Sequence, residues 1–159
     1  MAAAPRTLVL YIGNPIVTND QIGLIAGRAL ASHLHGRADV EVQELTGSPL
    51  DILGHLEGYA RLVIVDSMHL PGLEPGTVRV FGETEIRQHE AGFHVHGMNV
   101  ADVLAAARRM ELAVPDEVVL IGIEAGAMDR FGEQLGPELV ARAEEVCREV
   151  AELVGRLLG

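Results

Sequence analysis

The sequence predicts an α/β fold, a single domain over residues 1–159 built on a mostly parallel sheet. Two observations lead to this prediction. Three runs, at residues 7–12, 62–65 and 118–123, consist almost wholly of apolar, β-favouring residues, as strands buried on both faces do. Segments with apolar residues at helical spacing alternate with these runs. The 159 residues suit one domain with its own core, and they show no internal repeat and no linker.

The strands are expected, in chain order, at residues 7–12, 40–43, 62–65, 77–81 and 118–123. The second strand alternates valine with polar residues, so one of its faces is wetter than the other. The fourth follows the third after a connection that contains Pro-Gly turn signals and no helical pattern. A connection that short joins antiparallel strands, so the fourth strand is expected to run against the others.

Helices are expected to begin at residue 19 or 20, at 48, at 99 and at 137. Ser48 and Asn99 can each accept a hydrogen bond from a first helical turn, and Pro49 suits a first helical position. The last helix carries an apolar stripe as far as residue 158, and Cys147 lies on it. Cys147 is therefore expected to be a small core residue, not a nucleophile. The histidine-rich stretch at 85–97 is expected to be irregular.

Composition excludes several classes of function. The formal net charge is −11 and all twelve basic residues are arginine, which argues against nucleic-acid binding. Without lysine there is no Walker phosphate lysine, no Schiff base and no Ser-Lys catalysis. One cysteine forms no internal disulfide and fits a reducing cytoplasm. We find no signal peptide and no apolar run near the roughly 20 residues of a membrane helix, so a cytoplasmic location is expected.

The candidate site follows from a rule for open α/β sheets, which bind ligands beyond the carboxyl ends of their strands, near a switch in strand order. The segments to which the rule points contain Asp20, after the first strand, Asp66, after the third, and His96, before the third helix. Two carboxylates and an imidazole suit a borderline divalent metal such as nickel or zinc. Three protein ligands leave coordination positions open for water or substrate.

Each of these residues also has a structural explanation. Asp20 can cap a helix or complement its dipole. Asp66 ends an apolar strand, where a carboxylate without a partner is costly, so a functional role is favoured there. His96 taken alone resembles an ordinary surface histidine, and His94 and His69 are weaker candidates. The loop at 13–23 has neither the glycine spacing of a dinucleotide site nor a P-loop ending, and no serine lies in a G-x-S-x-G elbow.

Taken together, these segments resemble the [NiFe]-hydrogenase maturation endopeptidases over nearly the whole chain. The opening is similar to the family's first strand and its Gly-Asn-x-(Leu/Ile)-x-x-Asp-(Asp/Glu)-x-x-Gly signature. Three later segments are similar, in order, to three further family features: the second strand that ends in an acid, the histidine with the helix that follows it, and the final strand with its loop and helix. The four segments are LVLYIGNPIVTNDQIG, LVIVDSM, HGMNVADVLAAA and IGIEAGAMDRFGEQLGPELVARA.

The resemblance implies a three-layer sandwich, with a five-stranded twisted sheet, one strand antiparallel, and helices on both faces. Carried over by position, the family's metal-contacting residues fall on Asp20, Asp66 and His96, and the two acids are the expected catalytic residues. The chain departs from the family pattern at two places. Asn19 replaces the first acid of the usual pair, and Glu44 stands where many members carry an aspartate thought to affect activity.

The resemblance also implies the reaction: an endopeptidase removes the C-terminal extension of a nickel-loaded hydrogenase large-subunit precursor. Nickel is then presented by the substrate, and no permanently bound cofactor is expected. The protease is expected to act as a monomer. Either a metal-activated water or a pair of aspartates sharing a proton can carry out the hydrolysis. The rival hypothesis is a non-catalytic nickel-binding or small-molecule-binding α/β module, which predicts binding without cleavage.

Overall fold

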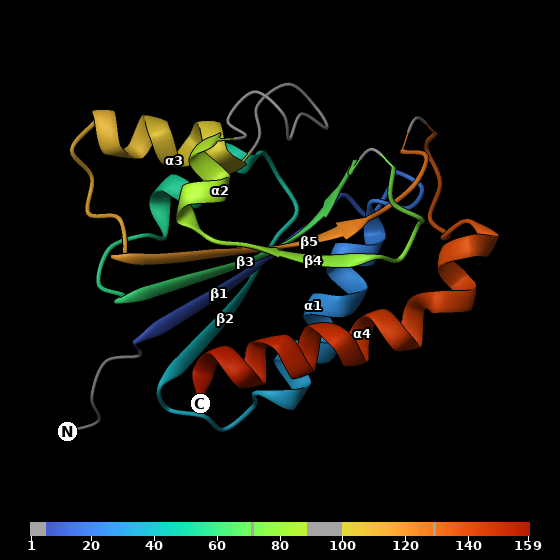
Figure 1. Ribbon diagram of the computed structural model, residues 1–159, viewed down its shortest axis with the longest axis horizontal. Helices are drawn as coiled ribbons and strands as arrows, with labels where there is room; N and C mark the ends of the chain where they lie inside the picture. The colour runs from blue at the N-terminus through green and yellow to red at the C-terminus, as the bar shows by residue number, and fades with distance from the viewer. Residues whose placement is uncertain (1–5, 71, 89–99, 129) are drawn as a thin grey trace.

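A computed structural model describes residues 6–70, 72–88, 100–128 and 130–159 (Figure 1). In chain order the elements are β1 (Thr7–Ile12), α1 (Gln21–His33), β2 (Val40–Leu45), the 3₁₀ helix η1 (Pro49–Gly54), β3 (Arg61–Met68), β4 (Val78–Phe81), α2 (Glu83–Gln88), α3 (Val100–Arg109), β5 (Glu117–Glu124) and α4 (Pro137–Leu158). None of the helices in these ranges is long and apolar enough to cross a membrane.

The strands form one five-stranded sheet in the order β2-β1-β3-β5-β4. Neighbouring strands are parallel except for β4, which runs antiparallel to β5. The predicted fold class, including its antiparallel strand, is confirmed. From β1 the chain goes to β2 on one side and then returns to β3 on the other. The order of the strands therefore switches between β1 and β3, where open α/β sheets bind their ligands.

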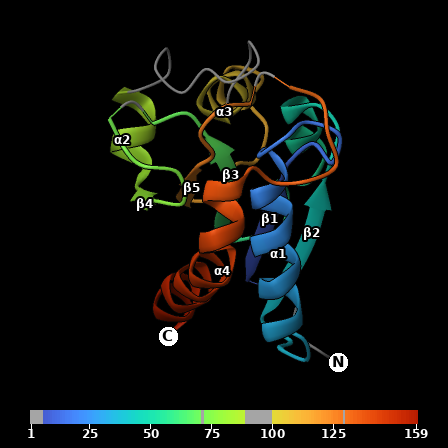
Figure 2. The same cartoon turned by 90° about the vertical axis from the view of Figure 1, so that its right-hand side faces the viewer.

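Helices cover both faces of the sheet. α1 and α4 lie on one face, and η1, α2 and α3 lie on the other (Figures 1 and 2). The strands alternate between two cores: Val63 and Val65 belong to the core beneath α1 and α4, whereas Leu62 and Ile64 belong to the core beneath α3. Since side chains alternate along a strand, Asp66 is on the same face as Ile64, the α3 side.

The predicted stripe of α4 is confirmed, because its buried residues recur at helical spacing at Leu139, Val146, Val150 and Val154. These side chains pack against the α1 side of the sheet. Each contributes roughly 1.5–3 kcal/mol when fully removed from water. Cys147 is only partly buried at the edge of this core, as expected of a small packing residue.

Three elements differ from the sequence prediction. The segment after Ser48 is a 3₁₀ helix six residues long; the Ser48 cap itself is confirmed, because its side chain accepts a hydrogen bond from the Leu50 N–H. α2 occupies residues 83–88, partly where an irregular stretch was expected. Only Ile86 is fully buried among its described side chains, and a single buried residue shows no helical spacing in the sequence. β3 continues to Met68, so Asp66 lies within the strand and not after its end. The predicted cap at Asn99 lies outside the described residues.

Candidate active site

The site lies at the carboxyl ends of the parallel strands, the end that faces the viewer in Figure 2. β1 and β3 are neighbours there, and Ile12, the last residue of β1, pairs with Asp66 of β3. The chain leaves β1 through the loop at 13–20, which ends at Asp20. The two predicted acids thus come from the two strands that flank the switch in strand order.

Asp20 is held as part of the loop and does not cap α1. It occupies the position before the first helical residue, but its side chain makes no capping hydrogen bond. Instead its Oδ2 accepts a hydrogen bond from the Asn14 N–H at 3.0 Å. Only 6% of the residue is exposed. The structure thus contradicts capping of α1 by the Asp20 side chain, whereas its roles at the helix dipole and in the site stay predictions.

Ser67 fixes the start of α1 against β3. Its Oγ accepts a hydrogen bond from the Gly23 N–H at 2.9 Å and donates one to the Asp20 carbonyl at 2.8 Å. The contact requires a glycine, because a Cβ at Gly23 would lie 2.4 Å from the Ile12 carbonyl oxygen. Ser67, which directly follows Asp66, therefore sets the position of Asp20. From the sequence, the serines were considered only as candidate nucleophiles; a hydroxyl near the end of the largely apolar β3 was the available signal for Ser67.

Asp66 is half-buried and lies close enough to Asp20 to sense its charge. Burial, and then the negative charge of Asp20, raise the pKa of Asp66 well above its ordinary value, and the Ser67 N–H opposes this only in part. Two carboxylates so placed repel each other when both are ionised. A bound cation or a shared proton relieves that repulsion. The cation corresponds to the predicted metal-activated water, and the shared proton to the predicted aspartate pair.

Asn19 joins the first loop to the segment between β5 and α4. Its Nδ2 donates to the Ala127 carbonyl at 2.7 Å, and its Oδ1 accepts from the Gly136 N–H at 2.7 Å. The residue is buried and has a φ of 71°, in the left-handed region that asparagine tolerates. Position 19, where the sequence showed a departure from the family pattern, is thus a structural junction.

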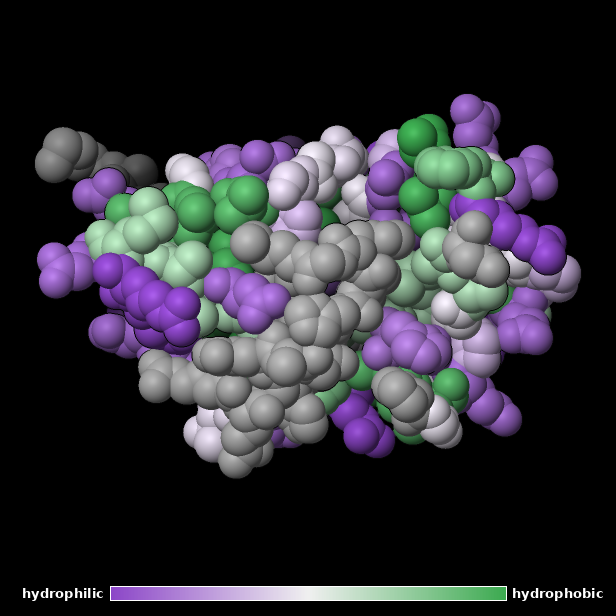
Figure 3. Space-filling model, turned by 90° about the horizontal axis from the view of Figure 1, so that it is seen from above, coloured by the Kyte–Doolittle hydropathy of each residue, from purple (hydrophilic) through white to green (hydrophobic). Residues whose placement is uncertain are grey.

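Residues 16–18 of the first loop and residues 130–132 run side by side as a short ribbon (Figure 2). The Thr18 N–H donates to the Arg130 carbonyl, and the Gly132 N–H donates to the Ile16 carbonyl, both at 2.8 Å. Ile16 is 53% exposed and Phe131 is 84% exposed. Figure 3 shows apolar surface at the end of the molecule where these loops lie. The rim of the site thus presents apolar side chains as well as acids.

Glu124 is a buried carboxylate that sequence reasoning did not select. It ends β5, is 2% exposed, and accepts hydrogen bonds from the Leu70 N–H and, at 2.9 Å, from the Gly126 N–H. His69 is largely exposed, with its Nδ1 3.7 Å from a Glu124 oxygen. Glu124 thereby anchors the turn that follows β3. The signal was the same as for Asp66: an acid within an apolar strand.

The remaining predicted residues fall into two groups. His96 and His94 lie outside the described residues. Glu44 lies on the α1 face of β2, opposite to the face of Asp66, and forms an ion pair with Arg28 at 2.8 Å. Burial raises the pKa of the Cys147 thiol, which disfavours the reactive thiolate. Glu44 is thus engaged by Arg28 on the face away from Asp66, and Cys147 packs in the core as predicted.

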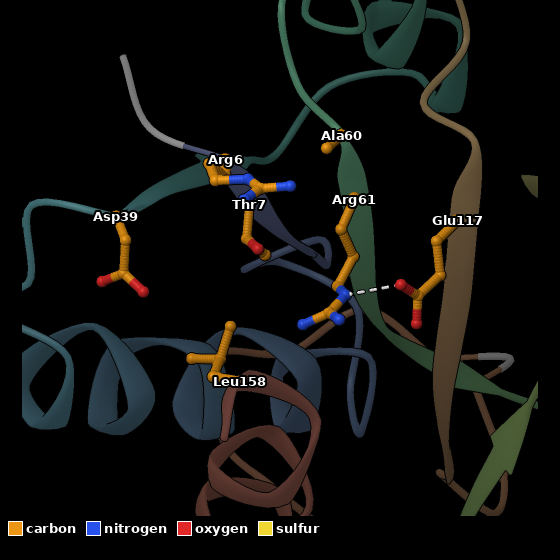
Figure 4. Close-up of a pocket in the computed structure, with 7 residues that line it drawn as sticks. All are labelled: Arg6, Thr7, Asp39, Ala60, Arg61, Glu117 and Leu158. Carbon is orange, nitrogen blue, oxygen red and sulfur yellow. Dashed lines mark hydrogen bonds and ion pairs between the residues drawn. The ribbon is translucent and has the colours of Figure 1, made fainter. Parts of the chain in front are cut away.

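Two further observations bear on ligands. Within the described ranges, no group of three or more His, Cys, Asp or Glu side chains is arranged to hold a metal ion. A cavity of about 320 Å³ opens at the amino ends of the strands, remote from Asp20 and Asp66 (Figure 4). One of its two arginines, Arg61, is already paired with Glu117 at 2.9 Å and with the Leu157 carbonyl. This cavity is separate from the candidate site.

Comparison with known proteins identifies the family of the chain. The family model described as hydrogenase maturation protease matches residues 26–153. The matched span includes positions 66 and 96, whereas Asp20 precedes it. The hydrogenase expression/formation protein HoxM of Azotobacter vinelandii is 25% identical over 153 residues, which are 95% of this chain and 73% of HoxM. The hydrogenase 2 maturation protease of Escherichia coli K12 is 27% identical over 119 residues, covering 74% of this chain and 72% of that protein.

Solved structures share the fold. The hydrogenase maturating endopeptidase HybD from E. coli superposes with a TM-score of 0.76 at 24% identity, covering 95% of this chain and 93% of HybD. The [NiFe] hydrogenase maturation protease HybD from Thermococcus kodakarensis superposes with a TM-score of 0.67 at 27% identity, covering 93% of this chain and 98% of that one. The sheet and helices described above are thus an architecture found in solved maturation proteases.

Proposed function

The chain belongs to the hydrogenase maturation protease family, an endopeptidase family, and from this premise we propose that Asp20 and Asp66 engage nickel carried by a hydrogenase large-subunit precursor and direct cleavage of its C-terminal extension. The observation that carries the proposal is the meeting of two acids at the β1–β3 switch point, where burial and then the charge of Asp20 raise the pKa of Asp66. His96, predicted from the sequence, is the proposed third ligand.

The chemistry of the pair supports a cationic substrate group. Carboxylate oxygens and an imidazole nitrogen are suitable ligands for nickel. Asp20 is anchored through Asn14 and Ser67, so its carboxylate is held in place before the substrate arrives. The Asp20–Asp66 repulsion raises the free energy of the ionised pair, and a divalent cation relieves it. The protease thereby recognises a precursor that already carries its metal.

Hydrolysis follows from this docking. A water oxygen attacks the carbonyl carbon of the scissile peptide bond while a carboxylate of the pair accepts the water proton. The C–N bond then breaks, and the proton passes to the departing amine. Nickel in the precursor polarises the carbonyl or the water when it lies beside the bond. In the alternative route, Asp20 and Asp66 share a proton and need no metal for the chemical step.

A cleavage assay on a cognate precursor tests the proposal. Mass spectrometry follows loss of the C-terminal peptide from nickel-loaded and nickel-free precursor, with wild type, Asp20→Asn, Asp66→Asn and His96→Ala. We expect nickel-dependent cleavage that each substitution reduces at least a hundredfold. Glu152→Gln is the control, because Glu152 is an exposed acid in α4, a helix that ends near the amino ends of the strands, away from Asp20 and Asp66; it should cleave at the wild-type rate.

The outcomes separate the hypotheses. Cleavage of nickel-free precursor at the same rate would favour the shared-proton route and contradict nickel docking. Cleavage that survives all three substitutions would show that the protein is a peptidase whose active site lies elsewhere. Binding of precursor or nickel without any cleavage would favour the non-catalytic module.

We also propose that the protease acts as a monomer in the cytoplasm and contains no permanently bound cofactor. Its negative net charge of −11 supports the absence of a nucleic-acid partner. Sedimentation velocity of the purified protein tests the oligomeric state, and metal analysis of the same sample tests the absence of a resident metal.

A further inference from the structure

Asn19 uses both ends of its side-chain amide to hold together segments that are distant in sequence. The Nδ2 donor reaches the Ala127 carbonyl, 108 positions away, and the Oδ1 acceptor receives the Gly136 N–H, 117 positions away, each at 2.7 Å. The residue is 9% exposed, so water competes little with these bonds. Gly136 is the residue before α4, which means that Asn19 links the first loop to the start of the last helix.

The chemistry of this junction is specific to an amide. An aspartate has nearly the same shape and could still accept the Gly136 N–H, but it has no hydrogen to donate to the Ala127 carbonyl. It would instead place a charged oxygen against that carbonyl oxygen. The backbone adds a second restriction, because a φ of 71° is readily adopted only by glycine, asparagine and aspartate.

Asn19 also lies directly before Asp20, and it acts on the same short stretch of chain as Ser67. The Asn19 carbonyl accepts the Ile22 N–H at 3.1 Å, which starts α1. The Asp20 carbonyl accepts from Ser67 at 2.8 Å. The peptide that carries the Asp20 carboxylate is therefore fixed from one side by the Asn19 amide and from the other by β3.

We infer that Asn19 is a positioning residue for the cleavage reaction: it holds the Asp20 carboxylate in register with Asp66 by tying the first loop to the segment before α4. The inference rests on the proposed function, because it assigns Asn19 an effect on catalysis through Asp20. It explains why this chain uses an amide at the position before its first site acid: the amide is a tether, and the charge of the site resides on Asp20 and Asp66.

Two substitutions separate the amide from the backbone conformation. Asn19→Gly keeps the left-handed φ and removes both amide bonds, whereas Asn19→Asp keeps the shape and the acceptor but removes the donor. We expect both to lower the single-turnover rate of cleavage of nickel-loaded precursor by ten- to a hundredfold, on the order expected for a misplaced catalytic group. A matched core variant, Val154→Ala, loses stability far from the loops and should retain the wild-type rate.

A double-mutant cycle with Asp20→Glu provides the readout that a purely structural role would not move. Glutamate keeps the carboxylate on a longer side chain, which depends less on the exact place of its backbone. Asn19→Gly should therefore reduce the rate at least threefold less in the Asp20→Glu background than in wild type, while the loss of thermal stability is the same in both.

The possible outcomes are distinguishable. Equal rate losses in both backgrounds, or wild-type rates for both Asn19 variants, would overturn the inference while leaving the protease and its acids in place. If instead wild type does not cleave the loaded precursor, or Asp20→Asn cleaves normally, then the proposed function or its site has failed. In that case the inference falls with it.

Discussion

Gly23 packs closely against the backbone of the sheet, and an alanine there tests how the site is held. A Cβ at this position would lie 2.4 Å from the Ile12 carbonyl oxygen and 2.9 Å from the Ser67 Oγ. Ordinary contact begins at 3.4 Å, so the first turn of α1 must move by about 1 Å or Ser67 must turn away. Gly23→Ala therefore perturbs the junction that places Asp20 beside Asp66.

The expected magnitude combines three effects. Overpacking a tight contact costs roughly 1–3 kcal/mol. The hydrogen bond from the Gly23 N–H to Ser67, which the displacement weakens, contributes about 1 kcal/mol. Replacing glycine by alanine in a helix returns at most about 1 kcal/mol. The net effect is a loss of about 2 kcal/mol of unfolding free energy, which lowers the Tm of a domain of this size by about 4–8 °C.

Gly155→Ala is the matched control. Gly155 also lies in a helix, but a Cβ there would meet nothing within 4 Å. Only the helix-forming gain remains, so the free energy of unfolding should rise by about 0.5–1 kcal/mol. Thermal melts by circular dichroism and urea titrations measure both variants. Cleavage by Gly23→Ala should also fall at temperatures where it is fully folded, whereas Gly155→Ala should cleave as wild type does. A Gly23→Ala protein that melts at or above the wild-type Tm would refute the close packing of α1 on β3.

Three further predictions concern single side chains. Folding raises the pKa of Asp66, so ionisation of Asp66 destabilises the folded state as pH rises above the unfolded pKa. Asp66→Asn should therefore increase the Tm by a few degrees at pH 7 and by almost nothing below about pH 4, where Asp66 is protonated in both states. Calorimetry measures both values. The Tyr59 hydroxyl donates to Glu41, which lowers the pKa of Glu41, while burial first and then Glu41 raise the pKa of Tyr59 to about 12. Tyr59→Phe should therefore lose about 1 kcal/mol at pH 7, and urea titrations should show the loss shrinking as pH falls through the lowered pKa of Glu41. Cys147→Ser should cleave precursor at the wild-type rate. Iodoacetamide should not inhibit the native wild-type enzyme at pH 7, because burial raises the pKa of the Cys147 thiol. Rapid inactivation by iodoacetamide would contradict the role of Cys147 as a packing residue.

The parts of the fold that the sequence predicts are those with strong local periodicity. β1, β3, β5 and α4 bury nearly continuous runs or a regular stripe, so their type follows from composition and spacing. α2 was missed because Ile86 is its one fully buried residue among the described side chains, at 83–86, and a single apolar position shows no helical spacing. η1 was assigned to the wrong helix type because Ser48 caps both kinds of helix in the same way.

The same distinction applies to the site. Asp20 and Asp66 were predicted because parallel strands end at one edge of a sheet, and the residues at those ends can be read from the sequence. The groups that hold them could not be predicted in the same way. Ser67 bonds to a residue 47 positions away, and Asn19 bonds to residues more than 100 positions away. Local patterns contain no information on such partners.

The long-range bonds of Asn19 have a consequence for the order in which the enzyme becomes competent. Residues 127 and 136 are synthesised after β5, so a growing chain that already contains Asp20, Asp66 and three paired strands still lacks the two bonding partners of the Asn19 side chain. The Asn19 junction can therefore form only after residue 136 has been synthesised, whereas the Ser67 bonds to the start of α1 need only the chain up to β3. A nascent chain that has not yet reached α4 contains both acids and Ser67 but lacks the Asn19 bonds, so its first loop is held from one side only.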